Sequence, residues 1–465
     1  MRTRRHAHPL LVTTAVGAAA LVTLSGCAVG TGGQSGADDA EYSSDATLDG
    51  ELSVMGFSGV DEVATSRMDF AEQQLGDGVE VKLTEGELDL QQFLSAAATG
   101  SPPDLIYANR DQIGSLAARG AILPLGSCFE GEGIDADAFV EPALEQVTLG
   151  GEVYGVPEFN TVQITMANAD LLEEAGLSVD DVNGSDWEAM SAANEALMQR
   201  DGSLSVIGVD SKLPEFFPLW ARANGVELLS EDGREANLDD PAAIEALEWA
   251  VGIYDAQGGF GDVKALRDSA DFFGEGNQFA TGVLGAMPME QWYVNVLNDV
   301  SPDAPMVFDT VRDHEGEPIA YASGSAWAIP SGAENPEAAC RWARAMTSVD
   351  AWIAAAEARL DLREEEGKPF TGILTGNADA DEQIREMVTS GGEPWDSAVE
   401  AVYEANEHTF TLPANPADAE FEAALNDAIN DVLSGDAEAA DALARAQETA
   451  QEALDEAWAK VEEGS

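Results

Sequence analysis

Basic residues are scarce in this sequence. The 465 residues include 22 Lys and Arg against 87 Asp and Glu, and the formal net charge is −65. So much negative charge repels nucleic-acid phosphates and anionic lipid headgroups, and we therefore expect no nucleic-acid partner. The acid excess does not indicate disorder, because a hydrophobic content of 45% is ordinary for a folded protein.

Histidine is rarer still. Of four histidines, His6 and His8 lie near the N-terminus, which leaves only His314 and His408 in the rest of the chain. This offers little to a histidine-rich zinc site or to Ser-His and Cys-His catalysis. We expect no metal, no cofactor and no enzyme activity.

Long apolar runs are missing except near the N-terminus. Arg2, Arg4 and Arg5 precede an uncharged run at 10–24, shorter than the ~20 residues that a membrane-spanning helix needs. A basic start, a short apolar run and small residues before a cleavage point are typical of an export signal. The run ends in Leu-Ser-Gly-Cys, which resembles a bacterial lipobox and implies cleavage before Cys27 and lipid attachment to its sulfur.

We therefore expect a lipoprotein signal at 1–26 and a flexible tether at 27–47, a segment rich in Gly, Ser, Thr and Asp. An ordinary secretory signal with an incidental cysteine is the alternative, and export by the Sec or the twin-arginine route stays open. With no later apolar span, we expect the folded part outside the cytoplasm, lipid-anchored to the outer face of the cell membrane.

Only two cysteines follow Cys27, namely Cys128 and Cys340. Outside the cell, a pair of thiols more often forms a disulfide than stays free. Spacing alone fixes no contact, so two separately buried thiols remain the alternative.

The folded part begins with strand-like and helical runs in alternation. In order, they cover 52–56, 61–75, 79–83, 89–98, 104–107 and 112–119. This βαβαβ order predicts an α/β fold with a mostly parallel, doubly wound sheet. Ligands of such sheets bind outside the carboxyl ends of the strands, which points to 56–59 and 108–112.

Later segments are more helical. A helix is predicted from Pro241 onward, after two acids that suit a helix N-terminus. Residues 416–462 are rich in alanine and acids, with apolar residues at helical spacing. A coiled coil is the alternative there, but 434–436 (Ser-Gly-Asp) divides the segment into two ordinary helices.

Eight short motifs occur in the order found in a known family. They are TGSPPD at 99–104, GAILPL at 120–125, GEVYGVP at 151–157, NADLLEEAGL at 168–177, ANG at 223–225, EDGREANLD at 231–239, FATGVLGAM at 279–287 and IPSGAENPEAA at 329–339. Together they resemble the extracellular solute-binding proteins of ABC importers, in the maltose-binding-like group.

The resemblance implies a two-lobed, type II periplasmic-binding-protein-like fold, each lobe a mostly parallel sheet flanked by helices, with a hinge between the lobes. Transferred in order, lobe 1 covers 48–156 plus 302–375, and lobe 2 covers 157–301 plus 376–465. Cys128 and Cys340 then fall in one lobe, which favours the disulfide. The implied partners are a small-molecule solute, held in the cleft between the lobes, and the membrane subunits of an ABC permease. We expect a monomer.

The resemblance also implies which residues hold the solute. A sugar needs flat apolar rings against its C–H faces and carboxylates or amides for its hydroxyls. Trp292, two residues after Glu290, stands where a tryptophan of the group stacks on sugar; packing at a helix start is the alternative. Phe216, Phe217 and Trp220 resemble an aromatic loop of the group, and spacing does not separate core from cleft there.

Residues 107–112 resemble a loop that carries an aromatic residue, an acid and an arginine in the group. Asp111 matches the acid, with a helix N-cap as its alternative role. Gln112 stands in the place of the arginine and Ala108 in the place of a tryptophan. The stacking platform is therefore lost, which argues against a linear maltodextrin.

Other candidates follow Pro157 or lie in loops and strand ends that face the cleft in relatives. Thr161 occupies the position of the usual binding acid, for which Glu158 could compensate. The remaining candidates are Ser58, Asn109, Asn160, Ser323, Ser325, Trp327 and Trp395. Acids of the last helix, such as Glu438, Asp441 and Glu448, are predicted to form a solvated face.

The sequence thus predicts capture of a mono- or oligosaccharide for an ABC permease. Arg110 is the only base in the predicted cleft loops, which suits neutral polyols; a polyamine or a glycerophosphodiester is the alternative solute. A secreted glycoside hydrolase is the alternative of another class. It would need two carboxylates about 5–9 Å apart, and no motif pairs two acids in that way.

Overall fold

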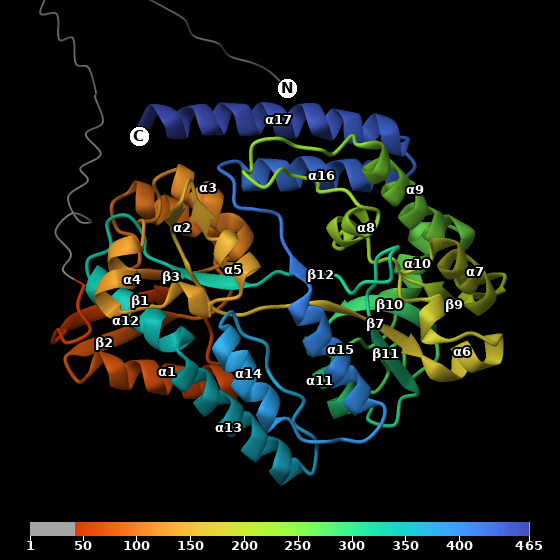
Figure 1. Ribbon diagram of the computed structural model, residues 1–465, viewed down its shortest axis with the longest axis horizontal. Coiled ribbons are helices and arrows are strands. Elements are labelled where there is room, and N and C mark those ends of the chain that lie inside the picture. The colour runs from red at the N-terminus through yellow and green to blue at the C-terminus, as the bar shows by residue number, and fades with distance from the viewer. Residues whose placement is uncertain (1–41, 465) are drawn as a thin grey trace, which may run out of the picture. The chain divides into compact units, whose positions relative to one another are not determined.

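The computed structural model describes residues 42–464, which belong to one compact unit (Figure 1). The predicted signal at 1–26 and the predicted lipid-bearing Cys27 lie outside the described residues and stay predictions. Within 42–464, no helix is both long enough and apolar enough to cross a membrane.

The first of two five-stranded sheets has the order β2-β1-β3-β13-β6. Its strands are β1 (Gly50–Met55), β2 (Val79–Thr84), β3 (Leu105–Asn109), β6 (Val156–Pro157) and β13 (Ser325–Ala328). β1 pairs in parallel with both β2 and β3, as the βαβαβ pattern predicts. β13 runs antiparallel to β3 and β6, because the chain returns to this sheet from the opposite end.

Helices join and cover these strands. α1 (Glu62–Leu75) and α2 (Leu90–Ala98) begin after Asp61 and Asp89, whose side chains accept hydrogen bonds from backbone amides of the first turn. Both lie where the sequence predicts them. The other helices around the first sheet are η1 (Arg110–Gln112), α3 (Ile113–Ala118), α4 (Gly126–Glu132), α5 (Glu141–Glu145), α12 (Pro336–Thr347), α13 (Val349–Glu366) and α14 (Ala378–Met387).

The second sheet has the order β11-β7-β10-β9-β8. Its strands are β7 (Gln163–Asn168), β8 (Gln199–Asp201), β9 (Ser203–Val209), β10 (Leu284–Glu290) and β11 (Met306–Thr310). Only β9 and β10 pair in parallel, so both sheets are mixed rather than mostly parallel. β11 lies within the range expected for lobe 1 but pairs with β7 of the second sheet.

The helices around the second sheet include the one predicted from Pro241. They are α6 (Ala169–Ala175), α7 (Trp187–Leu197), α8 (Phe217–Ala223), α9 (Pro241–Ala256), α10 (Phe260–Arg267), α11 (Trp292–Val300) and α15 (Trp395–Glu407).

Two helices end the chain, α16 (Asp418–Leu433) and α17 (Ala439–Gly464), separated where the sequence predicts a break. They pack on each other, and both contact α3 as well as α9 (Figure 1). Gly114 of α3 permits the close approach, because a Cβ there would lie 2.3 Å from the carbonyl oxygen of Asn415. α16 is thereby held over the junction between the two sheets.

Three segments of the chain cross between the two sheets, from β6 to β7, from β11 to β13 and from α14 to α15. In the first of them, Thr161 and Glu158 hydrogen-bond to the second crossing segment, to the start of β13 and to the loop between α13 and α14. Thr161 and Ser323 exchange backbone hydrogen bonds of 2.9 and 3.2 Å. Glu158 donates its amide to the carbonyl of Ser325 at 3.0 Å and accepts the amide of Gly376 at 2.7 Å. Any relative movement of the two sheets must bend these segments.

The disulfide between Cys128 and Cys340 is confirmed; it joins α4 to α12. The end of the expected tether packs beside it. Arg341 donates to the carbonyl oxygens of Ser43 and Ala46, and the ring of Tyr42 packs on the same core. The expectation of a flexible segment is therefore wrong for 42–46, because Tyr42 supplies apolar surface and Arg341 supplies donors for the backbone.

Candidate functional site

A cavity of about 530 Å³ lies where the carboxyl ends of β3 and β10 face each other beneath α16. We call it the larger cavity. Its lining includes Arg110, Asp111, Glu215, Phe216, Glu290, Tyr321, Ser323, Asp418, Phe421 and Glu422. The sequence argument pointed to 56–59 and 108–112, and of these two segments only the second, at the carboxyl end of β3, lines this cavity.

Arg110 forms the floor of the larger cavity and is only 1% exposed. Its Nε donates to Oε1 of Gln146 at 3.0 Å, its Nη1 to the carbonyl oxygen of Phe159 at 2.9 Å, and its Nη2 to Oδ1 of Asn160 at 2.9 Å. Burial lowers the pKa of Arg110 to about 10. The guanidinium thus holds the segment at 159–160 in place, and three of its five N–H groups are engaged.

Three acids of the larger cavity come from two separate elements. Asp111 belongs to η1, whereas Asp418 and Glu422 belong to α16. Burial raises the pKa of Asp111 to about 6, and the charge of Glu422 adds to the effect. Burial also raises the pKa of Asp418 well above its ordinary range, and one of its oxygens, Oδ2, accepts no hydrogen bond from the described residues.

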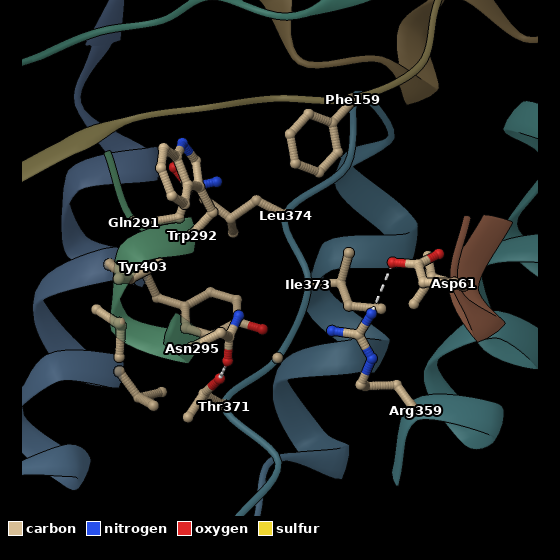
Figure 2. Close-up of a pocket in the computed structure, with 15 residues that line it drawn as sticks. Asp61, Phe159, Gln291, Trp292, Asn295, Arg359, Thr371, Ile373, Leu374 and Tyr403 are labelled. Atoms are coloured by element: carbon tan, nitrogen blue, oxygen red, sulfur yellow. Dashed lines mark hydrogen bonds and ion pairs between the residues drawn. The ribbon is translucent and has the colours of Figure 1, made fainter. Parts of the chain in front are cut away.

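A smaller cavity of about 210 Å³ lies beside α11, α13 and α15 (Figure 2). Trp292 and Tyr403 line one side, and Asp61 and Arg359 line the other, with the segment 371–374 between them. Arg359 and Asp61 form an ion pair at 2.9 Å. The Tyr403 hydroxyl is buried and has no hydrogen-bond partner among the described residues.

Trp292 and Glu290 link the two cavities. Nε1 of Trp292 donates to Oε2 of Glu290 at 3.2 Å, although Trp292 lines the smaller cavity and Glu290 the larger one. Trp292 is half-buried, and one ring face stacks against Phe273. Burial raises the pKa of Glu290, an effect that the nearby charge of Lys212 reduces.

Several predicted aromatic contacts are core residues. Phe217 and Trp220 are 0% and 1% exposed on α8, where Nε1 of Trp220 donates to the carbonyl of Ser211 at 2.8 Å. Trp327 lies in β13, between β3 and β6, and is 0% exposed. Trp395 is 5% exposed and packs beside Phe308. We leave these four out of the site, since their rings are covered by neighbouring protein; Phe216 alone of its trio lines the larger cavity.

The predicted binding residues of the first crossing segment bond to other parts of the protein and hold that segment in place. Glu158 is fully buried and pairs with Arg67. Asn160 accepts from Arg110 and donates to Oδ1 of Asn406 at 2.8 Å. The hydroxyl of Thr161 meets that of Ser323. These side chains position the cavity wall rather than reach into its centre.

The remaining candidates lie near the ends of the first sheet. Oγ of Ser58 accepts the amide of Gly86 at 2.7 Å. Asn109 is exposed at the end of β3, and Ser325 begins β13. Gln112 lines a pocket next to the larger cavity, together with Asp111 and Glu422. No group of three metal-ligating side chains occurs within 42–464.

Sequence reasoning missed the contribution of α16. Phe421 and Glu422 lie one helical turn after Asp418, a spacing that also fits an ordinary amphipathic helix. Only the packing of α16 against α3 turns that face toward the cavity. Glu438, Asp441 and Glu448 are exposed on the neighbouring stretch, as predicted.

Residues 67–360 match the family model described as "Bacterial extracellular solute-binding protein". The chain belongs to this family. It is a family of binding proteins and not of enzymes, which agrees with the absence of a catalytic motif.

Relatives within this solute-binding family include sugar-binding members. A maltooligosaccharide ABC transporter solute-binding lipoprotein of Streptococcus pneumoniae is 23% identical over 279 residues, 56% of this chain and 60% of that protein. The maltodextrin-binding protein MdxE of Bacillus subtilis is 22% identical over 344 residues, 72% of this chain and 75% of that protein.

Solved structures support the fold. CpMnBP1 with mannobiose bound matches 86% of this chain and 99% of its own, with a TM-score of 0.69 at 20% identity. MalX of Streptococcus pneumoniae in complex with maltopentaose matches 87% of this chain and 100% of its own, with a TM-score of 0.62 at 19% identity. At such low identity, the likeness establishes the α/β architecture of this solute-binding protein and not its ligand.

Proposed function

We propose that this protein is the extracellular substrate-binding component of an ABC transporter and captures a mono- or oligosaccharide. The observation that carries the proposal is the larger cavity, which is enclosed by strand ends of both sheets and by α16. Its lining combines aromatic rings, amides and carboxylates, the groups that bind the C–H faces and hydroxyls of a sugar.

The proposed ligand set differs from the one predicted. It keeps Asp111, Phe216, Glu290 and Trp292 and adds Tyr321, Phe421 and Glu422, all of which line one of the two cavities. Gln112 is kept at the edge of the site. A glycerophosphodiester is disfavoured, because Arg110 is the only basic side chain in the described lining and three of its five N–H groups are already bonded within the protein.

Delivery of the solute to the permease would follow from closure of the two halves of the protein around the solute. The two sheets are joined by three narrow segments, and a solute that contacts both sides stabilises the arrangement in which they are closest. The membrane subunits of the permease would recognise that closed state. Cleavage before Cys27 and lipid attachment to its sulfur would keep the protein at the outer face of the cell membrane.

A thermal-shift screen tests the proposal. The panel holds neutral mono- and oligosaccharides, amino sugars, polyamines and glycerophosphodiesters, since only a bound ligand stabilises the fold, by ~2.7 kcal/mol at a hundred times the Kd. At least one saccharide is expected to raise the Tm. A stabilising ligand drawn only from the other classes would contradict the proposal, as would hydrolysis of an aryl glycoside.

A further inference from the structure

The larger cavity carries far more negative than positive charge. Its described lining holds five carboxylates and one base, Arg110. The carboxylates belong to Asp111, Glu215, Glu290, Asp418 and Glu422. General acidity of the chain does not account for this, because acids such as Glu448 lie on solvated helix faces, whereas these surround a shared enclosed space.

Little of that charge is neutralised within the protein. Arg110 hydrogen-bonds to the neutral groups of Gln146, Phe159 and Asn160, and its charge offsets part of the charge of the adjacent Asp111. Lys212 pairs with Glu215 at 3.0 Å, which accounts for one carboxylate. Among residues 42–464, no ion pair engages the other acids of the cavity.

Asp111 and Glu422 are the two carboxylates best placed for a ligand. They reach the same space from η1 and from α16, and both side chains are accessible there. Each disfavours the charge of the other, as the raised pKa of Asp111 reflects. Beside them, the buried Oδ2 of Asp418 lacks a hydrogen bond, which is uncommon for a buried polar atom in a native protein.

A protonated amine would satisfy this arrangement. An ammonium group brings a positive charge and three donors, whereas a hydroxyl brings one donor and leaves the carboxylates mutually repelling. The rings of Phe216, Tyr321 and Phe421 line the same cavity, and they offer apolar faces to a sugar ring and electron-rich faces to a cation.

We infer that the solute of the larger cavity is an amino sugar, as a monosaccharide or short oligosaccharide, with its protonated nitrogen between Asp111 and Glu422. The inference rests on the proposed function, because it specifies the solute of the same cleft. It replaces the neutral polyol that the loops alone suggested.

Calorimetric titration at pH 7 with matched pairs tests the inference. The pairs are glucosamine with glucose, galactosamine with galactose, and the glucosamine trisaccharide with cellotriose. The monosaccharide pairs exchange one ammonium group for a hydroxyl, and the trisaccharide pair exchanges three. The best amino member is expected to bind at least about tenfold more tightly than its neutral partner, the effect of one hydrogen bond between charged groups.

Two substitutions test whether Asp111 and Glu422 cause the preference for the amino sugar. Asp111→Asn and Glu422→Gln should each weaken binding of the amino sugar about tenfold more than binding of the neutral partner. Glu448→Gln removes the same charge from α17 and should leave the preference unchanged. A preference that survives both cavity substitutions overturns the inference.

The outcomes separate the two proposals. Equal or tighter binding of a neutral partner overturns the inference and leaves the sugar-binding function standing. Tighter binding of spermidine than of every amino sugar, or no binding by any saccharide, overturns both.

Discussion

At the scale of single residues, the end of β10 explains how one short stretch serves two cavities. Trp292 and Glu290 are two positions apart, and their side chains line different cavities while remaining hydrogen-bonded to each other. The indole N–H therefore holds the carboxylate in place, and the exposed part of the ring is left for a ligand.

Trp292→Ala should weaken binding of the true ligand by about 1–3 kcal/mol, the range for loss of an aromatic anchor. Calorimetric titration measures the Kd. Trp249→Ala is the matched control, because Trp249 is a half-buried tryptophan of α9 that does not line either cavity. An unchanged Kd for Trp292→Ala would remove this residue from the site.

Arg110 has a structural role that the sequence did not reveal. Two of its hydrogen bonds tie the end of β3 to the first crossing segment, and the third reaches Gln146 at the end of α5. Arg110→Met should lower the free energy of unfolding by about 2–5 kcal/mol, since buried acceptors lose their donors. Arg110→Lys should fail to restore it, because an ammonium group cannot match the planar fork. Denaturant titration decides this, and full stability of the lysine variant would refute the role.

At the scale of elements, a series of hydrogen-bonded polar side chains connects Arg110 in the cavity lining to α14. Asn160 bonds to Arg110 and to Asn406, and Nδ2 of Asn406 donates to Oδ2 of Asp381 at 3.1 Å. The amide of Thr375, in the loop between α13 and α14, donates to Oδ1 of Asp381 at 2.7 Å. This series of hydrogen bonds therefore couples the end of β3, α15 and α14.

Asp381 should make stability depend on pH. Burial raises its pKa to about 7, so the folded protein holds a proton that the unfolded chain, with an ordinary pKa near 4, releases. This contribution therefore destabilises the fold progressively as the pH rises from about 4 to about 7. Asp381→Asn should remove it, and the stability of the variant relative to the wild type should increase over that range, by at most ~4 kcal/mol.

Denaturant titrations of both proteins at several pH values measure the difference. Asp379→Asn, two residues earlier on the exposed side of α14, is the control. A pH-independent difference between Asp381→Asn and the wild type would show that burial does not perturb this carboxyl.

The disulfide ties α4 to α12 across a sequence separation of 212 residues. Replacement of Cys128 and Cys340 by alanine should cost about 2–5 kcal/mol of stability. Thermal or denaturant unfolding measures the loss. A thiol titration of denatured, unreduced protein should find neither cysteine free, and two free thiols would contradict the bridge.

At the scale of the whole molecule, the net charge of −65 is a cost to the compact state. Added salt screens repulsion between exposed carboxylates. The free energy of unfolding should therefore rise with NaCl between about 0.01 and 0.5 M, where the screening length falls from ~30 Å to below 8 Å. Equal stability at low and high salt would show that repulsion between the acids does not destabilise the fold.

Much of the fold could be predicted because it follows from local pattern. Asp61 and Asp89 cap α1 and α2, and the glycine and serine near 435 separate α16 from α17. The direction of the later strands could not be predicted in this way. β13 and β11 are antiparallel to their neighbours because of the path by which the chain crosses between sheets, and that path is set by distant pairings.

The candidate site was predicted less well. Asp111 and Trp292 reach cavities, but Trp220 and Trp327 are equally aromatic and lie in the core. A side chain's type states what it can bind, whereas its exposure depends on which elements pack over it. Glu422 shows the converse, since it looks like any surface acid until α16 is placed against α3.

The sequence by itself determined the α/β class, the helix boundaries, the family and the acidity, because each depends on short-range pattern or on composition. Only the tertiary structure decided that the cysteines are bridged, that Arg110 hydrogen-bonds to the crossing segment, and that acids from η1 and α16 share one cavity. These features join residues that are far apart in the sequence, by 36 to 50 positions for Arg110 and by 212 for the cysteines. Their energies come from burial and from charges brought close together, and neither exists until the chain has folded.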